Sequence, residues 1–475
     1  MQRRGAWGVL IALIVAGILL ALFVQQIFGY RASLRVLPAG TSVAGLDVSG
    51  MTVERAIATL EGIYAQPVQL YYQEQMVELT PESVGLQFDL EATRAAIEAA
   101  VAGRRSFDGF MTYLLRRPTA PVNVTPTVTF SAERLDGFLQ RIAQQYDRPP
   151  SPPVALPDAL AFRAGRAGYE MDRAASHVQV AQALVSAAER RVALVIRVQE
   201  APPLNIAQLE EMLDVRLADF NGIAAVFVKD LQTGAELSIN GDVAYSGNDM
   251  LQLAVALETF RVLEQSPTVE QMTLLTQTLT QGDRAAANQL LQDVVGGGDV
   301  FQGVENLNAA MHYLGLVNTF MATPYDDVIV PPAIVTPANL RADVSTQPDP
   351  RMQTTAQDMG LLLEMVYQCS RGGGALPVAY PGAFSAHECQ QIVDILAGHR
   401  TDSFIELGLP PAMEVAHKLS ISPETHADGG IVFSPNGDFV LVVFLYSPQW
   451  LDWTVSNPFI ADVATATYNY FNPTP

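Results

Sequence analysis

The chain has 475 residues, 49% hydrophobic and 16% charged, a balance typical of a folded protein of about two to four domains. Its formal net charge of −21 argues against nucleic acid as a partner and gives no attraction to anionic lipid headgroups. Two cysteines and six scattered histidines, without C-x-x-C or H-E-x-x-H, suggest no metal site, and no cofactor is expected.

The N-terminal stretch carries the strongest physical signal. From Gly5 to Tyr30 there is no charged residue, and about 20 such apolar residues span a bilayer. Two arginines precede the stretch, which favours a cytoplasmic N-terminus and an exported remainder. We predict a cytoplasmic tail at 1–6 and an uncleaved transmembrane anchor at 7–29, which makes this a single-pass plasma-membrane protein that is mostly extracytoplasmic. A cleaved signal peptide is the alternative.

Two segments that resemble each other follow, and we place them at 33–118 and 119–200. In each, a glycine, two strand residues, an apolar residue and an aspartate precede a helical pattern, as GLQFDL from Gly85 and GYEMDR from Gly168. We interpret this as an internal repeat of α+β type. The second segment contains the linker DRPPSPPVALPD, which is expected to be extended and stiff because of its prolines.

The remaining domain, predicted at 204–475, begins and ends with strand patterns. GIAAVFVKDLQTGAELSI predicts one hairpin, and GGIVFSPNGDFVLVVFLYS predicts another with an Asn-Gly turn. Helical patterns such as LAVALETFRVLE and TAQDMGLLLEMVYQ lie between them. This order predicts the α+β class, with one antiparallel sheet covered by helices.

The same region resembles the class A β-lactamases and penicillin-recognising serine hydrolases across nearly its whole length. QGDRAAANQLLQDVVGG is similar to the segment that carries S-D-N, and AHKLSISPETHADGGIVF is similar to the K-T-G strand and the hairpin behind it. LNAAMHYLGL and TTAQDMGLLLEMVY are similar to two of the family's helices. The N-terminal segments, roughly residues 35–200, resemble the peptidoglycan-binding repeat of exported cell-wall proteins.

The resemblance implies demanding chemistry. In S-x-x-K, the serine attacks an amide carbonyl, and the lysine one helical turn later helps to deprotonate it. Here AYSGNDMLQL places Asn248 at the serine position and Leu251 at the lysine position. An amide is not an acyl-transfer nucleophile, and leucine cannot carry a proton. If the alignment slips so that Ser246 is the fallback nucleophile, the residue three later is Asp249, again not a lysine.

The other motifs are also degenerate. At S-D-N the chain has Gly282, Asp283 and Arg284, and at K-T-G it keeps Lys418 but continues with leucine and Ser420. No glutamate occurs where the family's deacylation base would lie, and the only acids there are the aspartates of TPYDDVIVPP. Each lost interaction would cost about 10²–10⁴-fold in rate, so we interpret the domain as a pseudoenzyme.

Most of the candidate residues also have a structural explanation. Ser246 is expected to be a turn residue, and Asp283 is expected to cap the following helix. Arg284 could fill the former cleft and pair with an acid there. Lys418, on a strand with His417, could still bind a substrate carboxylate, or it could be a structural lysine.

We therefore expect a membrane-anchored cell-envelope protein that binds peptidoglycan, its peptide stems or an envelope partner. The alternatives are an active serine β-lactamase or D,D-peptidase and a pure scaffold. Cys369 and Cys389 are the only cysteines, and both lie in the part predicted to be exported, so a disulfide is expected. Two buried free thiols are the alternative.

Overall fold

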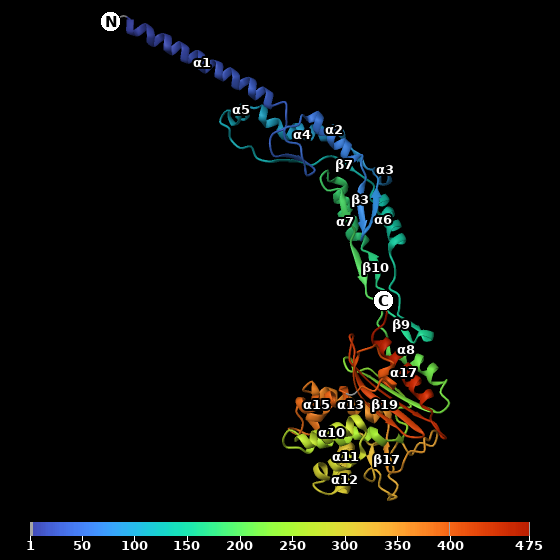
Figure 1. Ribbon diagram of the computed structural model, residues 1–475. Helices are drawn as coiled ribbons and strands as arrows, with labels where there is room; N and C mark the ends of the chain where they lie inside the picture. Colours follow the sequence, from blue (N-terminus) through green and yellow to red (C-terminus); the bar gives the residue numbers. More distant parts are fainter. Residues whose placement is uncertain (1–2, 399, 475) are drawn as a thin grey trace. The chain divides into compact units, whose positions relative to one another are not determined.

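The computed structural model describes residues 3–398 and 400–474, and the chain divides into two compact units (Figure 1). The N-terminal unit comprises Met1–Ser151 and Arg166–Ala201, and the C-terminal unit comprises Pro152–Gly165 and Pro202–Pro475. The proline-rich linker, which the sequence places inside the second repeat, therefore belongs to the C-terminal unit from Pro152 onward, where it supplies the first strand of a short hairpin.

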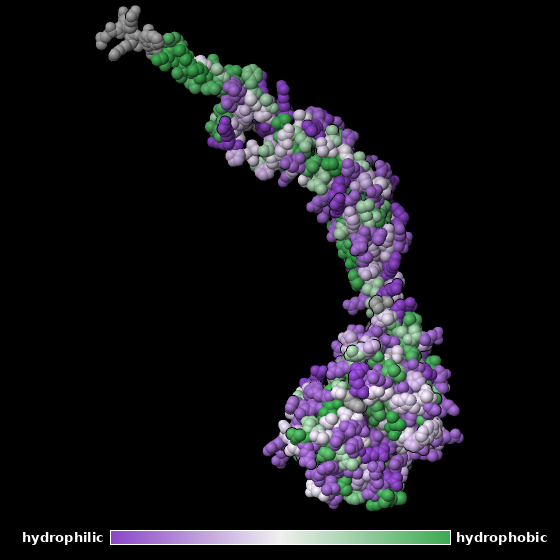
Figure 2. Space-filling view, viewed as in Figure 1, coloured by the Kyte–Doolittle hydropathy of each residue, from purple (hydrophilic) through white to green (hydrophobic). Residues whose placement is uncertain are grey.

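Helix α1 (Arg3–Ser33) begins the described part of the chain. Its segment Leu10–Ser33 has a mean hydropathy of 2.6, and its apolar side chains are exposed, as the hydrophobic surface along the helix in Figure 2 shows. In length and composition this helix is compatible with a membrane anchor or a signal sequence.

The rest of the N-terminal unit is built from short strands and helices. Its elements are β1 (Thr41–Val43), β2 (Leu46–Asp47), α2 (Val53–Tyr64), β3 (Val68–Tyr72), β4 (Gln75–Leu79), α3 (Pro81–Val84), β5 (Gln87–Phe88), α4 (Leu90–Val101), η1 (Ala102–Arg105), α5 (Phe107–Leu114), β6 (Val122–Val124), β7 (Val128–Thr129), α6 (Ala132–Tyr146), β10 (Gly168–Met171), α7 (Arg173–Val185), β11 (Arg191–Ala193) and β12 (Ile196–Gln199).

Two hydrophobic cores hold these elements together. One surrounds Leu60 and Ile97, and the other surrounds Leu70, Leu139 and Val180. Each core takes residues from both of the segments that resemble each other, because β1 pairs in parallel with β6 and β3 pairs in parallel with β11. The two segments are therefore interleaved in space, and the boundary between them in the sequence stays a prediction.

The repeated sequence pattern has a repeated structural role. Asp89 and Asp172 are the N-cap residues of α4 and α7, and each accepts a hydrogen bond from the backbone N–H three residues later, at 2.9 and 3.0 Å. A capping carboxylate satisfies a helix N–H that otherwise has no partner. The aspartate that the two segments share is thus a helix-start signal.

The C-terminal unit consists of strands and many helices. Its elements are β8 (Val154–Leu156), η2 (Pro157–Ala159), β9 (Ala161–Arg163), α8 (Ile206–Leu217), β13 (Ile223–Asp230), β14 (Glu236–Ile239), β15 (Tyr245–Ser246), η3 (Asn248–Leu251), α9 (Gln252–Val262), α10 (Val269–Gln281), α11 (Arg284–Leu290), η4 (Leu291–Val295), α12 (Val300–Tyr313), β16 (Phe320–Met321), β17 (Met352–Thr354), α13 (Ala356–Ser370), α14 (Ala375–Ala379), α15 (Ala386–Ala397), α16 (Phe404–Leu407), β18 (Glu414–Ile421), β19 (Thr425–Phe433), β20 (Phe439–Tyr446) and α17 (Trp453–Phe471).

One five-stranded antiparallel sheet organises this unit, in the order β14-β13-β20-β19-β18. The two predicted hairpins meet in it, and helices cover both faces, so the predicted α+β class is confirmed. The core on one face includes α9, α10, α12, α13 and α15, and the core on the other includes α8, α16 and α17. A disulfide joins Cys369 of α13 to Cys389 of α15.

Candidate functional site

The candidate site lies where η3 and α10 meet the edge strand β18. Side chains alternate between the two faces of a strand, so Lys418 and Ser420 share one face. The Lys418 ammonium donates a hydrogen bond to the backbone carbonyl of Thr278 in α10, at 3.2 Å. The Ser420 hydroxyl accepts one from the backbone N–H of Asp249 in η3, also at 3.2 Å.

Asp249, and not Asn248, faces this cluster. A Cβ atom built on Gly282 would lie 3.5 Å from Asp249 Oδ2 and 3.9 Å from Lys418 Nζ, so the three residues border one small space. Asn248 has a left-handed backbone (φ 40°), and its carbonyl accepts a hydrogen bond from the Tyr325 hydroxyl at 3.1 Å. The structure therefore brings Asp249, the residue after the predicted serine position, near Lys418 and Gly282.

The residue at the predicted lysine position lies away from the cluster. Leu251 is fully buried, belongs to the apolar core and packs against Gly247, so it does not face the cluster. Gln252, three residues after Asp249, is also fully buried, and neither polar atom of its side chain has a hydrogen-bond partner among the described residues. A glutamine in the otherwise apolar run LQLAVAL is the signal in the sequence that points to this position.

Arg284 lies between two carboxylates. Its Nε is 3.1 Å from Asp249 Oδ1, and its Nη1 is 3.1 Å from Asp326 Oδ1. Partial burial lowers the pKa of Arg284, but these carboxylates raise it overall. The loop that carries Asp326 is fixed to α11, because the backbone of Tyr325 exchanges two hydrogen bonds of 2.9 Å with the Asn288 side chain. Arg284 thus ties η3, α11 and this loop together.

Lys418 is a buried cation without a close counter-charge. It is 4% exposed, and no carboxylate of the described residues forms an ion pair with it. Burial lowers the pKa of Lys418 to about 8, and the more distant carboxylates of Asp249 and Asp428 offset only part of that effect. A desolvated lysine with a displaced pKa is a recurring feature of functional sites.

His417 does not share the site with Lys418, which corrects the pairing expected from the sequence. Because adjacent strand residues point to opposite faces, the His417 ring packs on the α16 face. Its Nδ1 lies 3.0 Å from both carboxylate oxygens of Asp428, its Nε2 lies 4.0 Å from Glu406, and its side chain is 1% exposed. Burial lowers the pKa of His417, but Asp428 and Glu406 raise it above its ordinary value.

The two remaining candidates have local partners. The Ser246 hydroxyl accepts a hydrogen bond from the backbone N–H of Asp349 at 2.9 Å, and no histidine or lysine of the described residues bonds to it. Asp283 caps α11 by accepting hydrogen bonds from the N–H groups of Ala285 and Ala286, at 2.9 and 3.0 Å. Asp283 therefore has a structural role in this site.

A polar cavity of about 500 Å³ adjoins the cluster, between Ser246, Arg284 and the turn from β18 to β19. The Thr425 and Tyr446 side chains line it and are 4% and 5% exposed, yet neither hydroxyl has a hydrogen-bond partner among the described residues. The Glu424 carboxylate also lines the cavity and has no ion pair within the described part of the chain. The cavity thus offers two hydroxyls and an exposed carboxylate to a ligand.

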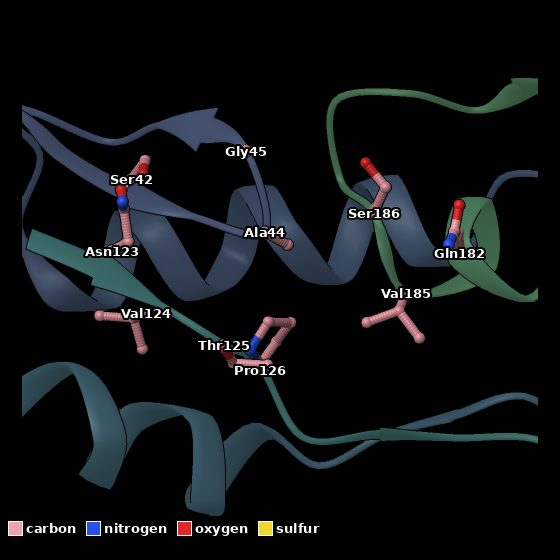
Figure 3. A pocket seen from close by; sticks show the side chains of 10 residues that line it. All are labelled: Ser42, Ala44, Gly45, Asn123, Val124, Thr125, Pro126, Gln182, Val185 and Ser186. Carbon is pink, nitrogen blue, oxygen red and sulfur yellow. Dashed lines mark hydrogen bonds between the residues drawn. The ribbon is translucent and has the colours of Figure 1, made fainter.

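A second cavity of about 500 Å³ lies in the N-terminal unit, between β1, β6 and the end of α7 (Figure 3). Its lining contains no charged side chain, although the chain is strongly acidic. Ser42 donates a hydrogen bond to Asn123, and Gln182 of α7 and Ser186, which follows α7, line the other end of the cavity. This lining suits a neutral polar ligand.

The described residues include no group of three His, Cys, Asp or Glu side chains that could hold a metal ion.

Comparison with known proteins identifies the class of the C-terminal unit. The model of the Beta-lactamase2 family, described as the beta-lactamase enzyme family, matches residues 262–471. Together with the sheet and its helical cover, this match makes the C-terminal unit a β-lactamase-like domain with a serine hydrolase fold. The matched range begins at the end of α9, so the positions of the nucleophile and its lysine lie outside it.

Solved structures of similar architecture cover little more than half of the chain. A structure of PBP-A has a TM-score of 0.43 and 17% identity, and covers 57% of this chain and 98% of its own. A β-lactamase from Streptosporangium roseum has a TM-score of 0.42 and 18% identity, and covers 55% of this chain and 97% of its own. An ancestral class A β-lactamase (GNCA) has a TM-score of 0.40 and 21% identity, and covers 55% of this chain and 98% of its own. No curated protein matches the chain.

Proposed function

We propose that this protein is anchored in the plasma membrane by α1 and that its β-lactamase-like domain binds a cell-envelope ligand without hydrolysing it. In this proposal residues 1–6 are cytoplasmic, 7–29 form the anchor, and 33–118 and 119–200 are repeats that face the cell wall. The domain at 204–475 is extracytoplasmic. Peptidoglycan, its peptide stems or an envelope protein would be the partner.

The ion pairs of Arg284 with Asp249 and Asp326 carry the proposal. Acyl transfer requires a nucleophile activated by a neighbouring base. Asp249 occupies the position beside Lys418, but its carboxylate is engaged by Arg284 and would form an anhydride rather than a stable ester with an acyl group. Gln252 cannot accept the proton, and Gly282 supplies no hydroxyl. The site retains charge and shape but has lost the groups that move protons.

Retention of binding is supported by two polar features. Lys418 stays buried at a cost in free energy, which is typical of a residue kept for a ligand. The cavity lined by Ser246 and Arg284 presents the unpaired hydroxyls of Thr425 and Tyr446 and the Glu424 carboxylate. In the N-terminal unit, the uncharged cavity of Figure 3 supports contact with a neutral glycan.

A stem peptide with a free C-terminal carboxylate tests the binding. Titrated by calorimetry into the detergent-solubilised full chain, it should bind, and Lys418→Met should weaken binding by at least ten-fold, since one charge-assisted hydrogen bond is worth roughly 1.5–3 kcal/mol. Glu305→Gln removes an exposed charge from α12 and serves as the control. Equal affinities of the wild type and Lys418→Met would remove Lys418 from the site, and no binding to either would favour the scaffold interpretation.

A further inference from the structure

The end of α1 and the short helix α5 form a basic pocket in an otherwise acidic protein. The segments 31–35 and 102–117 contain six arginines and one acid, Asp108, whereas the whole chain has a net charge of −21. A cavity of about 580 Å³ lies between these segments. Its charged lining consists of Arg104, Arg116, Arg117 and Asp108. The lack of attraction to anionic lipids inferred from the total charge therefore does not hold locally.

Aromatic contacts fix α5 against α1. The ring of Phe110 in α5 lies 6.1 Å from that of Phe23 and 5.1 Å from that of Tyr30, and Tyr113 lies 5.5 Å from Tyr30. A Cβ atom on Gly29 would lie 2.5 Å from the Tyr113 hydroxyl, so the glycine permits this close approach. The pocket is therefore bordered by α1 itself.

Arg104 lines the pocket and forms hydrogen bonds with the end of α1 and the residues after it. Its guanidinium donates hydrogen bonds to the carbonyls of Val36 at 2.9 Å and Ser33 at 3.0 Å, and its own carbonyl accepts one from the Tyr30 hydroxyl. Arg116 and Arg117 follow α5, are exposed and form no ion pair with any described residue. Their guanidinium groups are free to bind an anion.

The depth of the pocket follows from the length of α1. The 24-residue segment Leu10–Ser33 extends roughly 36 Å, and the hydrocarbon core of a bilayer is about 30 Å thick. If α1 spans the membrane, Tyr30 and Ser33, which line the pocket, lie at the level of the lipid headgroups. Helix α5 has no buried residue, and Phe107 beside the pocket is 75% exposed, as expected for a helix that lies at the interface.

We infer that this pocket binds the phosphate of an anionic phospholipid headgroup, with Arg116 and Arg117 as its donors. Guanidinium groups bind phosphate oxygens in bidentate geometry, and the neighbouring apolar surface of α1 and α5 accommodates the acyl chains. The inference rests on the proposed membrane anchoring, but not on the loss of catalysis.

The experiment titrates the detergent-solubilised full chain with short-chain phosphatidylglycerol, short-chain phosphatidylcholine and free glycerol phosphate by calorimetry. Phosphatidylglycerol should bind at least ten times more tightly than phosphatidylcholine, and glycerol phosphate should not bind at millimolar concentration. Arg116→Gln/Arg117→Gln should reduce the preference to within about twofold. Arg55→Gln/Arg173→Gln, which removes two exposed arginines elsewhere in the N-terminal unit, should leave it unchanged.

Equal binding of the two lipids, or an unchanged preference in the Arg116/Arg117 variant, would overturn the inference. Binding of glycerol phosphate as tight as that of phosphatidylglycerol would assign a soluble ligand and overturn the lipid source. Carbonate extraction of cell membranes tests the anchoring independently. A chain released by carbonate contradicts the proposed anchor, whereas a retained chain without lipid preference contradicts only the headgroup site.

Discussion

The two faces of strand β18 bury neighbouring basic side chains in different surroundings. On one face, His417 Nδ1 lies 3.0 Å from Asp428, and His417 Nε2 lies 4.0 Å from Glu406. On the other, Lys418 has a single hydrogen bond to a carbonyl, and the buried Gln252 side chain has no partner among the described residues. The first arrangement is that of a structural network, and the second is that of a site whose polar groups are kept for another purpose.

The largest effect is expected on the paired face. Asp428→Ala would leave His417 and the backbone N–H of Ile405 buried without their acceptor, which should lower the free energy of unfolding by about 3–5 kcal/mol. Urea unfolding followed by tryptophan fluorescence measures it, because Trp450 and Trp453 both lie in the C-terminal unit. A loss below about 1 kcal/mol would break the contrast between the faces.

Removing the disulfide measures how much the cross-link between α13 and α15 stabilises the domain, and both helices pack on the sheet face that carries Lys418. Cys389→Ser opens a loop of sequence separation 20 and should lower the free energy of unfolding by roughly 3 kcal/mol. The same fluorescence measurement applies, with reduced wild type as the control. If reduction leaves the wild type unchanged but the variant is destabilised, the loss comes from packing and not from the cross-link.

Lys418→Met should have the opposite sign and stabilise the domain by about 1–3 kcal/mol, since it replaces an unpaired buried cation with an apolar side chain of similar length. The pH profile sharpens this prediction. The folded pKa of about 8 lies below the unfolded value of 10.5, so the cost of Lys418 is fully present below pH 8 and disappears as the pH rises towards 10.5. Wild-type stability should rise across that window relative to Lys418→Met. A flat difference between the two would contradict the buried charge.

The smallest effect is expected for Arg284→Gln. Its side chain is 38% exposed, so solvent screens its ion pairs and the free energy of unfolding should fall by less than about 1 kcal/mol. Amide hydrogen exchange should nevertheless accelerate in the loop after Tyr325, because Asp326 loses its tie to α11. Unchanged exchange would mean that the Asn288 contacts alone hold this loop.

The sequence predicts the architecture better than the site. Hydrophobic alternation and the Asn-Gly turn predict the antiparallel sheet, and the capping aspartates predict the starts of α4 and α7. The register of η3 could not be read in the same way, because it depends on the left-handed backbone of Asn248, which turns Asp249 towards Lys418. The separation of His417 from Lys418 follows from strand alternation and was available from the sequence.

The interleaving of the two segments in the cores of the N-terminal unit also could not be predicted from the sequence. Local patterns specify single helices and strands, but the parallel pairing of β3 with β11 joins residues more than 100 positions apart. The basic pocket was missed because the total charge of −21 conceals a local excess of arginine. Its parts become adjacent only when α5 packs against α1.

The central claim is that the β-lactamase-like domain has lost its catalysis. Acylation by a penicillin tests this claim most directly. The full chain is incubated with excess benzylpenicillin and weighed by intact-mass spectrometry, beside Ser246→Ala and an active class A β-lactamase as the positive control. Because Asp249 is paired with Arg284 and gives no stable ester, Gln252 cannot accept a proton and Gly282 has no hydroxyl, we predict an unchanged mass. A stoichiometric adduct on the wild type that disappears in Ser246→Ala would contradict it.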